Sequence, residues 1–237
     1  LRKQDLRSDD TQERKRFEHM AKVWYHQIYN DFEKEGKSTE YALNYLKAVM
    51  SFFSRNDLPL RFRRKELKKP KKKIKRIYID IEDLKTAYTM LDVRGKAILT
   101  TLLQTGLSDT DLCALDIEYI EKELDNPPAY IEGYRQKTTE RFQTCIGADA
   151  CVAIQKYLIL RGNPKVGALF KTKFEERMTS RSLREDLKPI EKIIPNFQPK
   201  MLRDIYHDAL ERANIKEALA SRMFGHKLAG AKGSYLF

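Results

Sequence analysis

The chain has 237 residues, which is long for one ordinary domain and suits two small ones. Lys and Arg outnumber Asp and Glu by 46 to 34, so the net charge is +12, and this surplus favours a polyanionic partner over a merely soluble basic protein. No apolar run approaches the length of a membrane span, and Cys113, Cys145 and Cys151 lack the spacing of a zinc site or a disulfide framework, so the sequence indicates none of these classes.

The N-terminus lacks both an initiator Met and the apolar core of a signal peptide. We therefore expect a chain that starts inside a longer protein. We also expect a cytoplasmic, nucleoid-associated protein that needs no metal and no cofactor.

Residues 11–56 have the apolar periodicity of helices. The first predicted apolar stripe consists of Phe17, Met20, Ala21, Trp24 and Ile28. Gly36 is predicted to end this helix, and Ser38 to cap the next one. The buried face of the second helix is predicted to hold Tyr41, Tyr45, Ala48, Val49 and Phe52. These stripes indicate the core of a small helical bundle.

Residues 61–76 form a basic run that only Glu66 opposes. Its cations are Arg61, Arg63, Arg64, Lys65, Lys68, Lys69, Lys71, Lys72, Lys73, Lys75 and Arg76. Like charges repel one another and Pro70 disfavours a continuous helix, so the run should be extended. It is either a solvated linker or a linker that lies against DNA phosphates. We favour the second interpretation because the run joins two predicted domains and because counterion release rewards phosphate contacts.

Apolar periodicity resumes at Tyr78. Helices are predicted at 80–91, 94–104 and 109–115, and two short strands around a polar turn within 128–146. Further helices are predicted at 148–161, 180–193, 200–212 and 215–224, with Ser180 as an N-cap. The expected fold is mainly α with a small antiparallel β-sheet.

Several local patterns occur in a fixed order along this second half. They are Thr105-Gly106-Leu107 before Asp111-Leu112, the turn with Lys137-Thr138, Lys200-Met201-Leu202-Arg203, Gly225-His226, and Tyr235 nine residues after His226. Each pattern is weakly specific alone. As an ordered set, from about Tyr78 to Phe237, they resemble the catalytic domain of the tyrosine recombinases, the phage-integrase family, of archaeal or phage type.

The resemblance implies a catalytic set that acts on a phosphodiester, in which Tyr235 is the nucleophile and forms a 3′-phosphotyrosyl link. Fixed cationic donors would stabilise the negative charge of the transition state, namely the planar fork of Arg203, the ammonium of Lys200 and a hydrogen bond from His226. Lys137, on the turn, would protonate the departing 5′ oxygen.

Ser108 departs from this pattern, because it stands where the family places an arginine, and it cannot replace a guanidinium. Asp111 matches the acidic residue that holds that arginine. Three explanations follow. Another arginine, such as Arg94 or Arg135, reaches the site; the chain carries an inactivating change; or it is a natural DNA-binding protein with weakened catalysis.

The resemblance further implies two domains that clamp duplex DNA. These are a helical core-binding (SAM-like) domain at 1–66 and an α+β catalytic domain at 78–237, joined by a basic linker at 67–77. It implies a homotetramer on DNA in which each protomer donates a C-terminal segment. Because the chain stops two residues after Tyr235, we expect the isolated chain to be a monomer.

The predicted function is site-specific cleavage and rejoining of DNA in the integration or excision of a mobile element. The alternatives are an inactive DNA-binding protein on the same fold, a type IB topoisomerase, and a helical interaction module that avoids nucleic acid.

Overall fold

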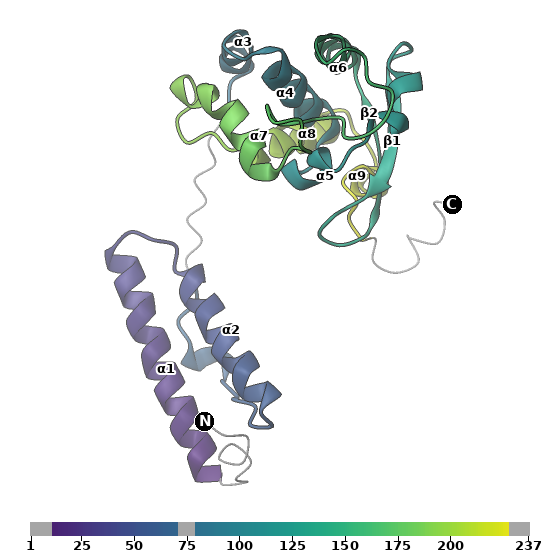
Figure 1. Ribbon diagram of the computed structural model, residues 1–237. Helices are drawn as coiled ribbons and strands as arrows, with labels where there is room; N and C mark the ends of the chain where they lie inside the picture. Colours follow the sequence, from purple (N-terminus) through teal and green to yellow (C-terminus); the bar gives the residue numbers. More distant parts are fainter. Residues whose placement is uncertain (1–10, 71–78, 228–237) are drawn as a thin grey trace. The chain divides into compact units, whose positions relative to one another are not determined.

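The computed structural model describes residues 11–70 and 79–227, and the chain forms two compact units, Leu1–Ile77 and Tyr78–Phe237 (Figure 1). The described chain is mainly helical with a small antiparallel sheet, which confirms the predicted fold class. Within the described ranges, no helix is both long and apolar enough to cross a membrane.

Two helices, α1 (Thr11–Lys34) and α2 (Glu40–Arg55), pack against each other in the N-terminal unit (Figure 1). Gly36, with a φ of 69°, permits the tight turn between them. The core of this unit contains Ala21, Tyr25, Tyr29, Ala42, Leu46 and Leu60. The helices form where the sequence predicted them.

The buried faces of these helices differ from the prediction. Tyr41, Tyr45 and Phe52 are 60%, 50% and 48% exposed, whereas Leu46 is buried in their place. In α1, Met20 and Trp24 are likewise exposed. Apolar residues lie on both sides of each helix, so periodicity alone does not select a face. Tyr25 and Tyr29 can be buried because their hydroxyls find carbonyl partners.

The start of the basic run folds back along α1. Leu60, Phe62 and Leu67 pack on the core of the N-terminal unit. The hydroxyl of Tyr25 donates to the Lys68 carbonyl at 2.5 Å, and that of Tyr29 to the Lys69 carbonyl at 3.1 Å. The apolar residues thus hold residues 60–69 on the unit. Cationic side chains of the segment remain exposed, among them Arg61, Arg63, Lys65 and Lys69.

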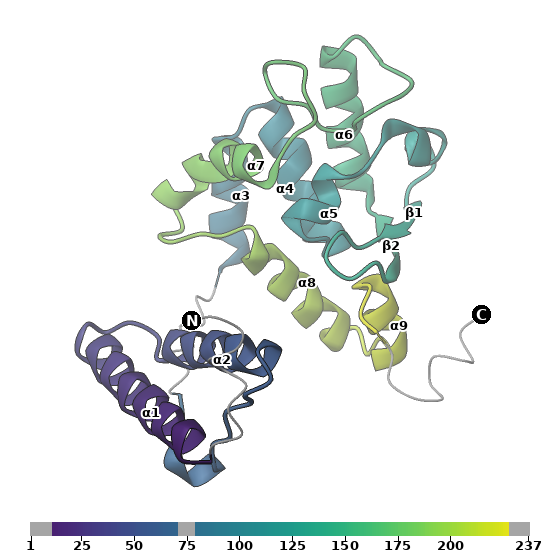
Figure 2. The same ribbon diagram turned by 60° about the horizontal axis from the view of Figure 1, so that its bottom comes forward.

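The core of the second unit surrounds α4 (Val93–Thr105). This helix packs against α6 (Ala148–Leu160), α7 (Ser180–Leu187) and α8 (Lys200–Arg212), and Figure 2 shows it in the middle of the unit. The remaining described elements are α3 (Ile81–Thr89), α5 (Asp109–Cys113), α9 (Glu217–Met223), β1 (Ala129–Tyr134), β2 (Arg141–Ile146) and short 3-10 helices at Arg64–Glu66, Ile117–Tyr119, Glu121–Glu123 and Lys188–Lys192.

Helix ends depart from the prediction at three places. The helix predicted at 180–193 changes into a 3-10 helix at Lys188, because Pro189 lacks the N–H that an α-helix would use. Thr179, not Ser180, caps α7, in a reciprocal arrangement with Ser182. Thr39 precedes α2, although the Ser38 hydroxyl accepts a long hydrogen bond from the Glu40 amide at 3.4 Å.

The two strands, β1 and β2, pair in register from Ala129 with Ile146 to Tyr134 with Arg141. Along β1, Ala129 and Ile131 are buried, while Tyr130, Glu132 and Tyr134 are exposed. Arg135 follows in the inward phase of this alternation. The Arg135 amide donates to the Glu140 carbonyl at 2.9 Å, so the turn that carries Lys137 begins directly after it.

Candidate active site

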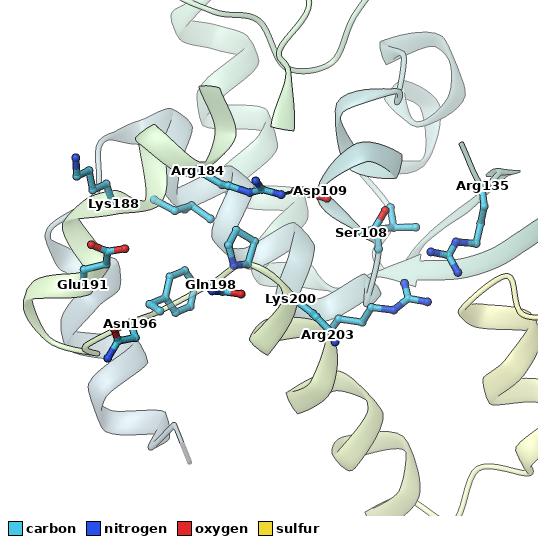
Figure 3. A pocket seen from close by; sticks show the side chains of 14 residues that line it. Ser108, Asp109, Arg135, Arg184, Lys188, Glu191, Asn196, Gln198, Lys200 and Arg203 are labelled. Atoms are coloured by element: carbon cyan, nitrogen blue, oxygen red, sulfur yellow. Dashed lines mark hydrogen bonds and ion pairs between the residues drawn. The ribbon is translucent and has the colours of Figure 1, made fainter. Parts of the chain in front are cut away.

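A cavity of about 710 Å³ opens on the second unit. Its walls come from the start of α5, the residue after β1, α7 with the following 3-10 helix, and the start of α8 (Figure 3). Ser108, Lys200 and Arg203, which the sequence singled out, all line it. Arg135 lines it as well. Residues far apart in the sequence therefore meet at one place.

Backbone carbonyls at two helix ends hold the guanidinium of Arg203. One terminal nitrogen donates to the carbonyl of Gly106, the left-handed residue after α4, and the other donates to the Phe224 carbonyl at 3.0 Å. Burial, and then the charge of Arg135, lower the pKa of Arg203 to about 10. Arg203 is still charged at neutral pH, and the two carbonyls fix the orientation of its guanidinium before any ligand binds.

His226 is positioned by the end of α9. Gly225 adopts a φ of 60°, its amide donates to the Arg222 carbonyl, and the His226 amide donates back to the Ser221 carbonyl at 2.8 Å. The imidazole Nε2 lies 3.3 Å from an Arg203 terminal nitrogen. Because arginine can only donate, Nε2 accepts and the ring is neutral here. Burial, followed by the charges of Arg203 and Arg135, keeps the pKa of His226 below its usual value.

Asp111 is a buried carboxylate with three donors around it. The Ser108 hydroxyl donates to Oδ2 at 2.6 Å, the Gln136 amide donates to Oδ1 at 2.9 Å, and Nε of Arg135 lies 3.3 Å from Oδ2. Ser108 also caps α5, since its hydroxyl accepts from the Asp111 amide at 3.2 Å. Ser108 thus supports Asp111 through its hydroxyl, whereas Arg135 supplies the cation.

Arg135 reaches Asp111 across Gly225. A Cβ atom added to Gly225 would lie 2.7 Å from both Cγ and Cδ of Arg135, so only glycine leaves room for this side chain. In Figure 3 the guanidinium groups of Arg135 and Arg203 point toward one another at the cavity. The Arg135 side chain is only 15% exposed.

The two lysines of the expected catalytic set have different positions. Lys200 is the first residue of α8 and lines the cavity. Lys137 is exposed in the turn between β1 and β2, and it does not line the cavity. The proposed nucleophile Tyr235 lies outside the described residues, as do Lys71, Lys72, Lys73, Lys75 and Arg76 of the basic run.

Two arginines were candidates to replace the one expected at position 108. Arg94 donates to Asp186 at 2.7 Å and to the Lys171 carbonyl at 3.1 Å, and it does not line the cavity. Arg135 does. The inward phase of β1 was the sequence signal that could have separated them, because an arginine in phase with buried residues needs a carboxylate partner.

Sequence reasoning missed Arg184, which lines the cavity and donates to Asp109 at 2.6 Å. Its position on α7 offered no motif. Among the described residues, His207, Asp208 and Glu211 could together approach a metal ion, with ligand atoms within 4.8 Å of one another. All three are exposed, on one face of α8, and none lines the cavity.

Comparison with known proteins gives the family context. The profile of the Phage integrase family matches residues 70–235. A crystal structure of the XerA recombinase is similar with a TM-score of 0.55 and 22% identity, covering 89% of this chain and 76% of that one. A lambda integrase (75–356) dimer bound to a COC′ core site is similar with a TM-score of 0.63 and 14% identity, covering 89% and 77% of the two chains.

The Tn1549 transposon integrase (82–397) in complex with circular intermediate DNA is similar with a TM-score of 0.61 and 17% identity, covering 91% of this chain and 79% of that one. At these identities the likeness concerns the fold. No protein among those with curated descriptions matches the sequence.

Proposed function

Because the chain belongs to the phage integrase family, we propose that it is a site-specific DNA recombinase that cleaves and rejoins duplex DNA during the integration or excision of a mobile element. The observation that carries this proposal is the convergence of Arg203, Lys200 and His226 at one cavity and its rim. Such a group of donors suits the phosphate of a DNA backbone. A structural relative, the Tn1549 transposon integrase in complex with circular intermediate DNA, supports this proposal.

In the proposed reaction the Tyr235 hydroxyl loses its proton to solvent, and its oxygen attacks phosphorus and displaces the 5′ oxygen of the DNA. A 3′-phosphotyrosyl bond forms as the phosphodiester bond breaks, and Lys137 gives its proton to the leaving oxygen. Arg203 and Lys200 stabilise the extra negative charge on the non-bridging oxygens. Strand rejoining is the reverse attack by a 5′ hydroxyl, so no external energy source is required.

His226 has a role suited to its position beside Arg203. A bound phosphate would add negative charge and raise the pKa of the imidazole, so the ring could then donate a hydrogen bond to a phosphate oxygen. The role of Lys137 requires the turn to approach the bound DNA, since the side chain lies outside the cavity in the free protein.

Duplex binding is proposed for both parts of the chain. Residues 1–66 would form the core-binding domain and 78–237 the catalytic domain; of the basic linker at 67–77, residues 67–69 are held on the N-terminal unit. The exposed cations Arg61 and Arg63 face solvent on the N-terminal unit and suit contacts with phosphates. A lambda integrase tetramer bound to a Holliday junction supports a tetramer on DNA for this chain as well.

The decisive experiment detects the covalent intermediate and identifies the preferred DNA site together. The protein is incubated with nicked duplexes of random sequence. Cleavage releases a short fragment that diffuses away, so the strand cannot be rejoined and the covalent adduct accumulates. Protein-linked DNA is then recovered under denaturing conditions and sequenced. We expect enrichment of one sequence and loss of all adduct in Tyr235→Phe, while the exposed control Tyr119→Phe keeps it. Duplex binding without any adduct would reduce the protein to a DNA-binding role.

A further inference from the structure

Three arginines line the cavity, and while Arg184 pairs with Asp109, the guanidinium groups of Arg135 and Arg203 point toward one another (Figure 3). Arg203 comes from α8 and Arg135 from the end of β1. They are close enough for the charge of Arg135 to lower the pKa of Arg203, after the larger effect of burial. Two like charges held together in a partly buried place cost free energy unless an anion lies between them. The arrangement therefore suits an anionic ligand.

The contact with Asp111 leaves the fork of Arg135 available. The ion pair uses Nε at 3.3 Å, and within the described part of the chain no hydrogen bond engages the two terminal nitrogens of Arg135. Asp111 also accepts from the Ser108 hydroxyl and the Gln136 amide, so it binds Arg135 through Nε alone. Asp111 therefore orients Arg135, and the two outer nitrogens of the fork can bind a second group.

The surroundings of Arg135 are shaped around this position. Gly225 leaves space for the Arg135 stem, where any side chain would come within 2.7 Å of it. Ser108 is small and turned to Asp111, so it does not compete for the cavity. Arg94 is committed to Asp186 in another part of the unit. Among the described arginines, Arg135 is the one that pairs with Asp111 and also lines the cavity.

We propose that Arg135 is a catalytic residue, whose guanidinium binds the scissile phosphate opposite Arg203 and replaces the arginine that the resemblance places at position 108. This inference rests on the proposed strand-transfer function. Arg135 and Arg203 would each contribute a fork to the two non-bridging oxygens. Ser108 is then no sign of an inactive protein.

The proposal also links two parts of the mechanism. Arg135 stands two residues before Lys137, and its backbone closes the turn through hydrogen bonds with Glu140 and Thr139. When Arg135 binds a phosphate, the base of the turn is fixed against the DNA backbone. The turn then carries Lys137 within reach of the leaving oxygen. One residue thus stabilises the transition state and anchors the segment that bears the proposed acid.

The test compares adduct formation in single turnover, on the enriched nicked duplex, for the wild type and five variants: Arg135→Ala, Arg135→Lys, Ser108→Arg, the double variant Ser108→Arg/Arg135→Ala, and Arg141→Ala. The matched control is Arg141→Ala, since Arg141 pairs with Glu132 on the same hairpin and does not line the cavity. We expect Arg135→Ala to slow adduct formation by about 10²- to 10³-fold, the usual effect of losing one oriented donor.

The other variants separate charge from geometry. Arg135→Lys keeps the charge without the fork and should recover only part of the rate. The double variant offers Asp111 an arginine from position 108 and should react at least about tenfold faster than Arg135→Ala. Ser108→Arg alone should not exceed the wild type, because Asp111 already has its arginine. Circular dichroism and thermal unfolding identify any variant that fails to fold.

A second readout does not depend on catalysis. Inorganic phosphate is titrated into each protein, and the imidazole NMR signal of His226 reports occupancy of the site. Arg135→Ala and Arg203→Ala should each weaken phosphate binding, whereas Arg141→Ala should not. If the wild type forms no adduct, the proposed function fails, and the phosphate titration still decides the role of Arg135. Wild-type phosphate affinity or a wild-type cleavage rate in Arg135→Ala would overturn the inference.

Discussion

His226 is the residue whose protonation depends most directly on its neighbours. Burial, Arg203 and Arg135 all lower the pKa of its imidazole. We expect an NMR titration to give a pKa below that of an exposed histidine, and Arg135→Ala to raise it, because one of the two nearby positive charges disappears. Arg141→Ala serves as the control. An unchanged pKa in Arg135→Ala would show that the two groups lie farther apart in solution.

The same shift has a consequence for stability. Since the folded protein holds a proton on His226 less readily than the unfolded chain, the unfolded state gains protons first as the pH falls. The contribution of His226 is therefore present above the ordinary histidine pKa and is lost as the pH falls toward the lower, folded value. His226→Gln should flatten the dependence of unfolding free energy on pH in that window.

At this scale the sequence anticipated part of the site. Motif spacing singled out Ser108, Lys200, Arg203 and His226, and the structure brings them to one cavity and its rim. The sequence left both Arg94 and Arg135 open; the inward phase of β1 favours Arg135, but the contact with Asp111 itself depends on how the hairpin folds back. A contact between residues 24 positions apart leaves little local trace in the sequence.

At the scale of elements, the turn after α4 depends on a glycine. Gly106 has a φ of 63°, and an added Cβ would lie 2.3 Å from the ring of Tyr206. Gly106→Ala should therefore destabilise the protein by about 1–2 kcal/mol from the left-handed backbone alone, and further through the clash with a packed ring. The displaced Gly106 carbonyl would also release Arg203.

A matched variant separates these two contributions. Gly162 also has a positive φ, of 79°, but nothing lies within 4 Å of an added Cβ. Gly162→Ala should show the backbone cost only. Thermal unfolding of both variants provides the comparison, and equal losses would mean that Tyr206 moves aside without cost.

Helix positions were predicted well, but helix faces less so. Helices α4 and α6 lie where expected because both are rich in apolar residues, many of which the core of the second unit buries. In α1 and α2, exposed aromatics such as Trp24 and Tyr45 lie 6.4 Å apart on the surface and imitate a core stripe. The buried face depends on which residues fill the space between the helices, which only packing decides.

For the whole molecule, the charge surplus of +12 predicts salt-sensitive binding to duplex DNA. The logarithm of affinity should fall linearly with the logarithm of salt concentration, with a slope of about −0.9 per neutralised phosphate. Replacing Lys71, Lys72 and Lys73 by Ala should flatten the slope by up to about three units. Filter binding over a range of salt concentrations measures it.

The control replaces three exposed lysines outside the basic run, Lys47, Lys122 and Lys156. Both variants lose the same net charge, so only contact with phosphates distinguishes them. If the two slopes change equally, the run acts through overall charge and does not lie on the DNA.

The alternation along β1 also limits how this hairpin can change in length. Residues added to the turn beyond Lys137 leave Arg135 in its inward phase and on Asp111. One residue inserted within β1 would instead turn Arg135 to the opposite face, since successive strand residues point to opposite sides. Asp111 would then remain buried without a cation. The hairpin therefore tolerates insertions at its tip, while its strand admits only changes that preserve the register.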